Sequence, residues 1–237
     1  MSVYVYAITK ASHPLRLDDV TGVGDPPAEI RVVPGDSLRA VISETPEDLS
    51  VSRHDLEAHH EVGQRLWADG PVLPLSFGFV AQDEDAVRAV MEEQGPQMAQ
   101  RLDELTGRGE FNVKGVVQED ALVRAELEEN EQARQLNERT REGGGSYEDR
   151  LALGQLLAEA VQRREQALAE EILAAVRPLA LAEQATPPSG QYFVNSSFLV
   201  DEERYDEFAR AGEELAERYG DRAELRLRGP LAPYSFV

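Results

Sequence analysis

The pattern that decides the fold begins at the stretch Glu110-Phe111-Asn112-Val113-Lys114-Gly115-Val116-Val117-Gln118. Phe111, Val113 and Gly115 fall on one face of this stretch, and the alternation predicts a strand. Helical sequence follows at 119–142, and a long amphipathic helix is expected from Ser146 to Pro178. A strand, a second strand, a helix and a last strand are then expected at 179–183, 192–200, 201–219 and 223–228. This is the βαββαβ order of a ferredoxin-like domain, with an extra helix in its first crossover.

The sequence before residue 110 predicts a separate α+β domain. Residues 3–8 are apolar or aromatic at every position, which is typical of a strand buried on both faces. A helix is expected from its N-cap Ser52 to about residue 68, and another begins at Asp83. The apolar segment 72–80 is extended, and Pro74 confines it to a sheet edge or an irregular strand. Two shorter strands are expected at 29–34 and 38–43.

The fold class predicted from the sequence is therefore α+β with two domains. We place the N-terminal α+β domain at residues 1–109 and the modified ferredoxin-like domain at residues 110–228. An extended C-terminal tail is expected at residues 229–237, which are rich in proline.

The charge composition narrows the classes of partner. The 237 residues include 24 basic and 45 acidic ones, a net charge of −21, with 41% hydrophobic residues as in globular proteins. A chain with this net negative charge repels the phosphate backbones of nucleic acids and anionic bilayers. We therefore expect no nucleic-acid partner and no membrane partner. The first residues lack the pattern of a signal peptide and no run of about 18 apolar residues occurs, which predicts a cytoplasmic protein.

No arrangement of residues in the sequence is typical of catalysis. The chain has no cysteine, which excludes disulfides, thiolate chemistry and cysteine-bound metals. His59 and His60 are adjacent and point about 100° apart on a helix, which does not suit a zinc site. We expect His60 to be half-buried and hydrogen-bonded, because it shares a helical face with Trp67. No Gly-x-Ser-x-Gly motif occurs, so the sequence predicts no enzyme, no cofactor and no metal.

Five segments, in this order, resemble the gas vesicle protein F/L family (GvpF/GvpL) over essentially the whole chain. They are Tyr4–Ile8, Val72–Gly78, Phe111–Val116, Val194–Val200 and Gly229–Phe236. The sequence has Ser76 where family members often have arginine, and Ala232 where Trp-Pro-Pro is common nearby. Any role of that arginine therefore does not carry over to this chain.

The resemblance implies a minor structural or assembly protein of gas vesicles, located in the cytoplasm or on the vesicle. It also implies two kinds of partner, the small hydrophobic shell protein GvpA and other accessory Gvp proteins. It implies no enzymatic activity and no cofactor.

Apolar and aromatic residues at the 72–80 segment and the C-terminal tail are candidates for binding a hydrophobic client. Packing inside the protein is the alternative role for the same residues. The candidate protein-binding residues are Trp67, Leu73, Leu75, Phe77, Phe79, Tyr234 and Phe236.

Two alternative functions stay open at the level of sequence. The first is a small-molecule-binding regulatory protein, which rests only on the ferredoxin-like fold. The second is a hydrolase, which has less support because no nucleophile–base pair is visible.

Overall fold

A computed structural model of the chain describes residues 1–47, 49–187 and 190–237. These residues form two compact units. The first comprises residues 1–111, 199–203 and 229–237, and the second comprises residues 112–198 and 204–228. The sequence division placed 229–237 in a tail of its own, whereas this segment packs within the first unit, because Ala232 and Phe236 are buried there.

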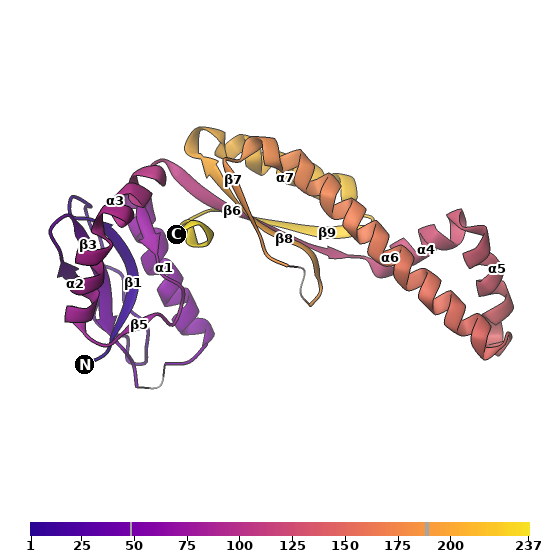
Figure 1. The fold of residues 1–237 in the computed structure, drawn as a ribbon, viewed down its shortest axis with the longest axis horizontal. Coiled ribbons are helices and arrows are strands. Elements are labelled where there is room, and N and C mark those ends of the chain that lie inside the picture. Colours follow the sequence, from indigo (N-terminus) through magenta and orange to yellow (C-terminus); the bar gives the residue numbers. More distant parts are fainter. Residues whose placement is uncertain (48, 188–189) are drawn as a thin grey trace. The chain divides into compact units, whose positions relative to one another are not determined.

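The first unit is built on a five-stranded sheet with the order β2-β3-β1-β4, in which β5 also pairs with β1 (Figure 1). Its strands are β1 (Val3–Lys10), β2 (Arg31–Pro34), β3 (Leu38–Glu44), β4 (Val72–Pro74) and β5 (Val80–Ala81). Its helices are α1 (Arg53–Asp69), α2 (Glu84–Glu93) and α3 (Gly95–Glu104). The short 3₁₀ helix η4 (Tyr234–Phe236) lies in the C-terminal segment.

Strand β1 is buried on both faces, as its sequence predicts. Tyr4 and Tyr6 pack with residues of α1, whereas Val3 and Val5 pack with residues of α2 and α3. An irregularity in the pairing with β3 lies between Val5 and Ala7, which places Ala7 on the same side as Tyr6. Helices therefore cover both faces of this sheet.

Local signals in the sequence set several helix ends. Ser52 is the N-cap of α1, where its hydroxyl accepts a hydrogen bond from the Asp55 backbone N–H, and Asp83 caps α2 in the same way. Pro74 lies in β4 at the edge of the sheet, where a missing N–H removes no ladder bond. These three predictions are confirmed.

The second sheet has the strand order β7-β8-β6-β9, with β6 and β8 in the centre. Its strands are β6 (Arg108–Val117), β7 (Ala182–Ala185), β8 (Tyr192–Asp201) and β9 (Ala223–Leu231). Its helices are α4 (Glu119–Glu129), α5 (Glu131–Thr140), α6 (Tyr147–Val176) and α7 (Tyr205–Tyr219), with 3₁₀ turns η1 (Arg141–Gly143), η2 (Arg177–Leu179) and η3 (Glu202–Arg204). This element order and strand order are those of a ferredoxin-like fold, and α6 and α7 lie on one face of the sheet (Figure 1).

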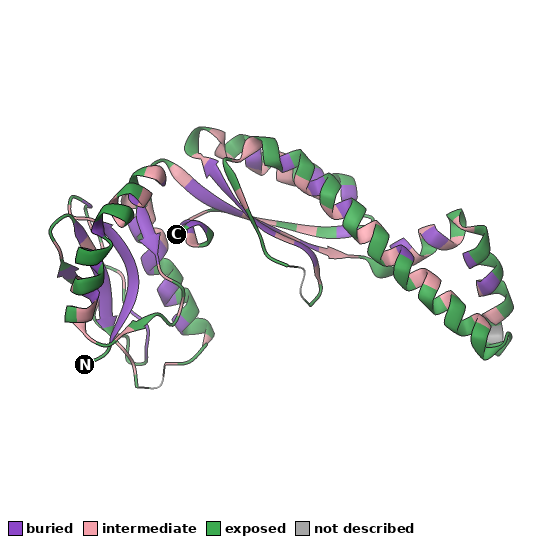
Figure 2. Cartoon of the chain, viewed as in Figure 1, coloured by how far each residue is buried: buried purple, intermediate pink, exposed green. Residues whose placement is uncertain are grey.

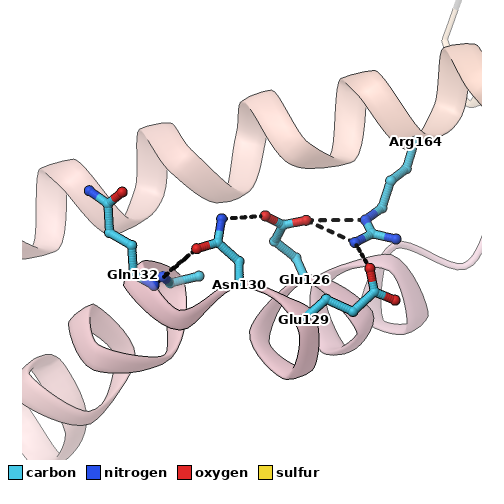
Figure 3. A network of polar contacts seen from close by, with 6 residues as sticks. Glu126, Glu129, Asn130, Gln132 and Arg164 are labelled. Atoms are coloured by element: carbon cyan, nitrogen blue, oxygen red, sulfur yellow. Dashed lines mark hydrogen bonds and ion pairs between the residues drawn. The ribbon is translucent and has the colours of Figure 1, made fainter.

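The enlarged first crossover contains two short helices before α6. The helical stretch 119–142 divides at Asn130, whose side chain accepts hydrogen bonds from the first N–H groups of α5. Glu126 of α4 is buried and pairs with Arg164 of α6 at 2.9 Å, and the Asn130 amide donates to its other oxygen (Figure 3). Arg164 also pairs with Glu129, so one guanidinium holds α4 against α6.

Candidate protein-binding site

An aromatic cluster lies between β1, α1 and the loop that follows β4. The ring of His59 is 5.8 Å from Tyr6, 5.6 Å from Phe77 and 5.9 Å from Tyr234 between centroids. Tyr4 and Tyr6 are 4.8 Å apart on neighbouring positions of β1. The cluster therefore joins elements from the two ends of the chain within the first unit.

Hydrogen bonds in this cluster fix the loop at residues 75–79. The Leu75 carbonyl can only accept, so His59 Nε2 carries the proton and donates to it at 3.0 Å. His59 Nδ1 then accepts from the Tyr4 hydroxyl at 2.8 Å, and that hydroxyl accepts from the Gly78 N–H at 3.0 Å. We call this chain of bonds the His59 relay.

The protonation states follow from burial. Burial lowers the pKa of His59 to about 4, so the ring is neutral at physiological pH. Burial likewise raises the pKa of Tyr4 to about 12. All groups of the His59 relay are therefore uncharged at pH 7, as tight packing in an apolar cluster requires.

The expectation of a half-buried His60 is wrong in its burial. His60 is exposed, although its ring stacks on Tyr234, and His59 is the buried one. The signal that identifies His59 is the buried stripe Ala58, Val62 and Leu66 of α1, since His59 adjoins Ala58 and lies three residues before Val62.

The candidate binding residues fall into three groups in the structure. Leu73 and Phe236 are buried in the core that includes α2 and α3. Leu75 is partly buried against the same core, while Phe77, Trp67 and Tyr234 are partly buried against the core next to α1. The Trp67 indole N–H also donates to the Arg108 carbonyl at 2.9 Å. Phe79 is 49% exposed.

Phe79 and the β5 residues Val80 and Ala81 form a short uncharged segment, which we call the apolar edge. Val80 is 41% exposed, and β5 pairs with β1 alone among the described strands. The Val5 N–H donates to the Phe79 carbonyl at 3.0 Å, which attaches the segment to β1. The apolar edge thus presents apolar side chains and an open strand side on a rigid support.

The C-terminal segment is fastened to the first unit by polar contacts. The Ser235 N–H and hydroxyl each donate to the Glu110 carboxylate at 2.7 Å, and Arg101 donates to the Phe236 carbonyl at 2.8 Å. The Tyr234 hydroxyl is buried without a partner, and burial raises its pKa. This segment completes the first unit, where its apolar residues Ala232 and Phe236 are buried.

The ranges that the structure describes contain no metal site. No group of three or more His, Asp or Glu residues there could hold a metal ion. In the second unit a hollow of about 420 Å³ lies beside α6 and the start of β8, yet no buried side-chain nitrogen or oxygen of that unit's described residues lacks a partner. The predictions of no metal, no cofactor and no enzyme stay predictions.

Comparison of the sequence with models of known protein families identifies the family of this chain. The model described as "Gas vesicle synthesis protein GvpL/GvpF" matches residues 2–237. The chain belongs to the GvpL/GvpF family. A role in gas vesicle formation follows from this membership, and the resemblance seen in the sequence is confirmed.

Relatives of this GvpL/GvpF family member cover its whole length. It is 41% identical to gas vesicle protein F of Streptomyces sp. (strain CB03234), over 100% of both chains. It is 29% identical to gas vesicle protein L of the same strain, over 99% of this chain and 92% of that one.

Solved structures share the fold of this GvpL/GvpF family member. GvpF from Anabaena sp. PCC7120 superposes with a TM-score of 0.80 at 22% identity, over 99% of this chain and 97% of that chain. GvpF from Microcystis aeruginosa gives a TM-score of 0.76 at 23% identity, over 99% and 98%. The predicted mixed α+β fold is thereby confirmed.

No helix in the described part of the chain combines the length and the apolarity needed to cross a bilayer.

Proposed function

We propose that this chain is an F-type gas vesicle assembly protein that binds the hydrophobic shell protein GvpA through the apolar edge. The observation that carries the proposal is the exposure of Phe79 and Val80 on a sheet edge that the His59 relay holds in place. A rigid apolar strand edge suits recognition of an extended apolar segment, because backbone bonds supply affinity and side chains supply fit.

The opposite edge of the same sheet is less suited to this role. Strand β2 carries Arg31, which pairs with Glu84 at 3.0 Å, and it ends in Pro34. Charge and proline at an edge oppose pairing with another strand. The apolar edge has neither, so it is the better candidate of the two.

The proposal reduces the candidate residues to those that a client can reach. Phe79 makes the direct contact, and Leu75 and Phe77 support it from the partly buried side. Trp67, Leu73, Tyr234 and Phe236 serve the packing of the first unit instead.

The physical need for such a protein follows from its client. A shell protein that forms a water-repelling wall exposes apolar patches before assembly, and such patches aggregate unless they are covered. A net charge of −21 on the binding protein keeps the complex in solution. The action takes place in the cytoplasm and at the growing vesicle, where other accessory Gvp proteins are further partners.

Assignment to the F type rests on the two relatives from one strain. Identity is 41% with the F protein and 29% with the L protein of Streptomyces sp. (strain CB03234).

A matched pair of variants tests the binding site. Val80 and Val32 are both 41% exposed and lie on opposite edges of one sheet. We expect Val80→Glu to weaken retention of purified GvpA by roughly tenfold, since it places a charge in an apolar contact, and Val32→Glu to change it less than twofold. Binding would be measured by titration against immobilised GvpA. Equal effects of the two variants, or none from Val80→Glu and Phe79→Glu, would show that the apolar edge is not the site.

A further inference from the structure

Helix α6 carries a continuous stripe of residues along one face, and packing within the chain buries only part of this stripe. The stripe follows alternating steps of four and three residues, the spacing of a helix-pairing seam. Its members are Tyr147, Leu151, Gly154, Ala158, Val161, Glu165, Leu168 and Ile172. Leu168 and Ile172 are buried within the second unit, whereas Tyr147 is 74% and Leu151 49% exposed. We call the part from Tyr147 to Glu165 the open seam. The end of α6 that adjoins α5 is coloured mostly as exposed or intermediate in Figure 2.

The centre of the open seam is made of small residues. Gly154 and Ala158 are both exposed, and nothing lies within 4 Å of the place where a Cβ on Gly154 would stand. Glycine inside a helix weakens it relative to alanine, and packing within the chain does not require it here. A second helix could approach closely at this point, with the larger Leu151 and Val161 on either side.

Tyr147, Leu151, Gly154 and Ala158 of the open seam are exposed, whereas Val161 and Glu165 at its other end are half-buried. Helix α4 is held to α6 beside the open seam by Arg164, which pairs with Glu126 and Glu129 of α4 (Figure 3). Ala160, which also lies off the open seam, is buried. The cluster of these three charged residues has one net negative charge and borders the open seam.

We propose that the open seam binds the same seam of a second copy of this chain, with the two helices antiparallel. With a two-fold axis near residue 156, Gly154 of each copy lies over Ala158 of the other, and Leu151 lies over Val161. Small residues then meet small ones at the crossing, and apolar ones meet at both ends, so the surface is self-complementary as a two-fold interface requires.

The local charges beside the open seam also favour this partner, although the net charge of −21 on each copy opposes association. In the antiparallel register Arg150, which flanks the open seam, faces the Glu126–Glu129–Arg164 cluster of the other copy. The two helices overlap for about 27 Å, at 1.5 Å per residue, which is a contact at the small end of the specific range. The dimer is therefore reversible, and salt strengthens it because it screens the charge of −21 on each copy.

Sedimentation equilibrium of the full chain tests the association. In 0.5 M NaCl we expect the mean mass to rise from 26.2 kDa towards twice that value as the concentration increases to several hundred micromolar. Leu151→Glu should abolish the rise, while Leu181→Glu should not, since Leu181 is equally exposed (50%) but lies off α6. Gly154→Leu should also abolish it without weakening the helix. A monomer at every concentration, or a dimer that survives Leu151→Glu, would overturn the proposal.

Cross-linking tests the register, and the absence of native cysteine makes it specific. A mixture of Leu151→Cys and Val161→Cys chains should form a mixed disulfide dimer on oxidation. Leu151→Cys alone should not, since two copies of position 151 would be about 15 Å apart along the axis, beyond disulfide reach. Arg150→Glu and Glu129→Arg should each weaken the dimer at least fivefold, and the double variant should restore it. Equal cross-linking of the single variants, or no rescue, would contradict the antiparallel pairing.

Discussion

Acid should destabilise the first unit through His59 before the carboxylates of the protein are protonated. His59 is neutral in the fold because burial lowers its pKa to about 4, whereas it titrates near 6.5 when unfolded. Between these values the unfolded chain binds a proton that the folded chain does not. The stabilisation is therefore complete above pH 6.5 and falls as the pH decreases towards 4.

The size of this effect follows from the two pKa values. The full difference corresponds to about 3 kcal/mol, of which about 1.5 kcal/mol falls between pH 7 and pH 5.2. The lower limit of pH 5.2 stays above the isoelectric point of about 4.5, where the chain would precipitate. His60 acts in the same direction as burial, because a positive charge on this neighbouring ring also lowers the pKa of His59.

Urea unfolding of the wild type and of His59→Gln isolates the contribution of His59 to the free energy of unfolding. The carboxylates titrate equally in both proteins, so their contribution cancels in the difference. The free energy of unfolding of the wild type minus that of the variant should decrease by about 1.5 kcal/mol between pH 7 and pH 5.2. An NMR titration of the His59 ring should give a pKa near 4. Parallel pH profiles of the two proteins, or a ring pKa above 6, would refute the buried neutral relay.

Three further changes test other contacts. Tyr234→Phe removes a buried hydroxyl that has no partner, so the free energy of unfolding should stay equal or rise by up to about 1 kcal/mol in urea titrations; a decrease in that free energy would reveal an unrecognised partner. Ser146→Ala removes the capping box with Asp149 and should cost the second unit about 1 kcal/mol by thermal melting, whereas an unchanged melting temperature would show that the helix end is frayed. Deletion of residues 232–237 uncovers the core around Phe236 and should lower the melting temperature of the first unit by at least about 5 °C; an unaltered melt would mean that the segment is dispensable.

Much of the fold can be predicted from short stretches of the sequence. The N-caps Ser52 and Asp83 and the edge position of Pro74 depend on a few neighbouring residues, so the sequence shows them directly. The βαββαβ order was equally readable, because each of its elements has a distinct periodicity. The division of 119–142 at Asn130 was missed, since an asparagine between two polar helices is a weak signal.

The proposed binding surface could be predicted only in part. The stretch from Leu73 to Phe79 is apolar except for Ser76, and sequence periodicity does not separate core residues such as Leu73 from exposed ones such as Phe79. The docking of the C-terminal segment depends on Glu110 and Arg101, more than a hundred residues away, and no local pattern announces such contacts. His59 was missed for a related reason, because the choice between two adjacent histidines depends on which helix face meets β1.

Vesicle formation in a living cell tests the central claim most directly. The gene would be deleted in a gas-vesicle-forming host and replaced by the wild type, by Val80→Glu or by Val32→Glu, with protein levels matched by blotting and vesicles counted by electron microscopy. The account predicts that the wild type and Val32→Glu restore vesicles and that Val80→Glu does not. Normal vesicles with Val80→Glu, or in the deletion strain itself, would contradict it.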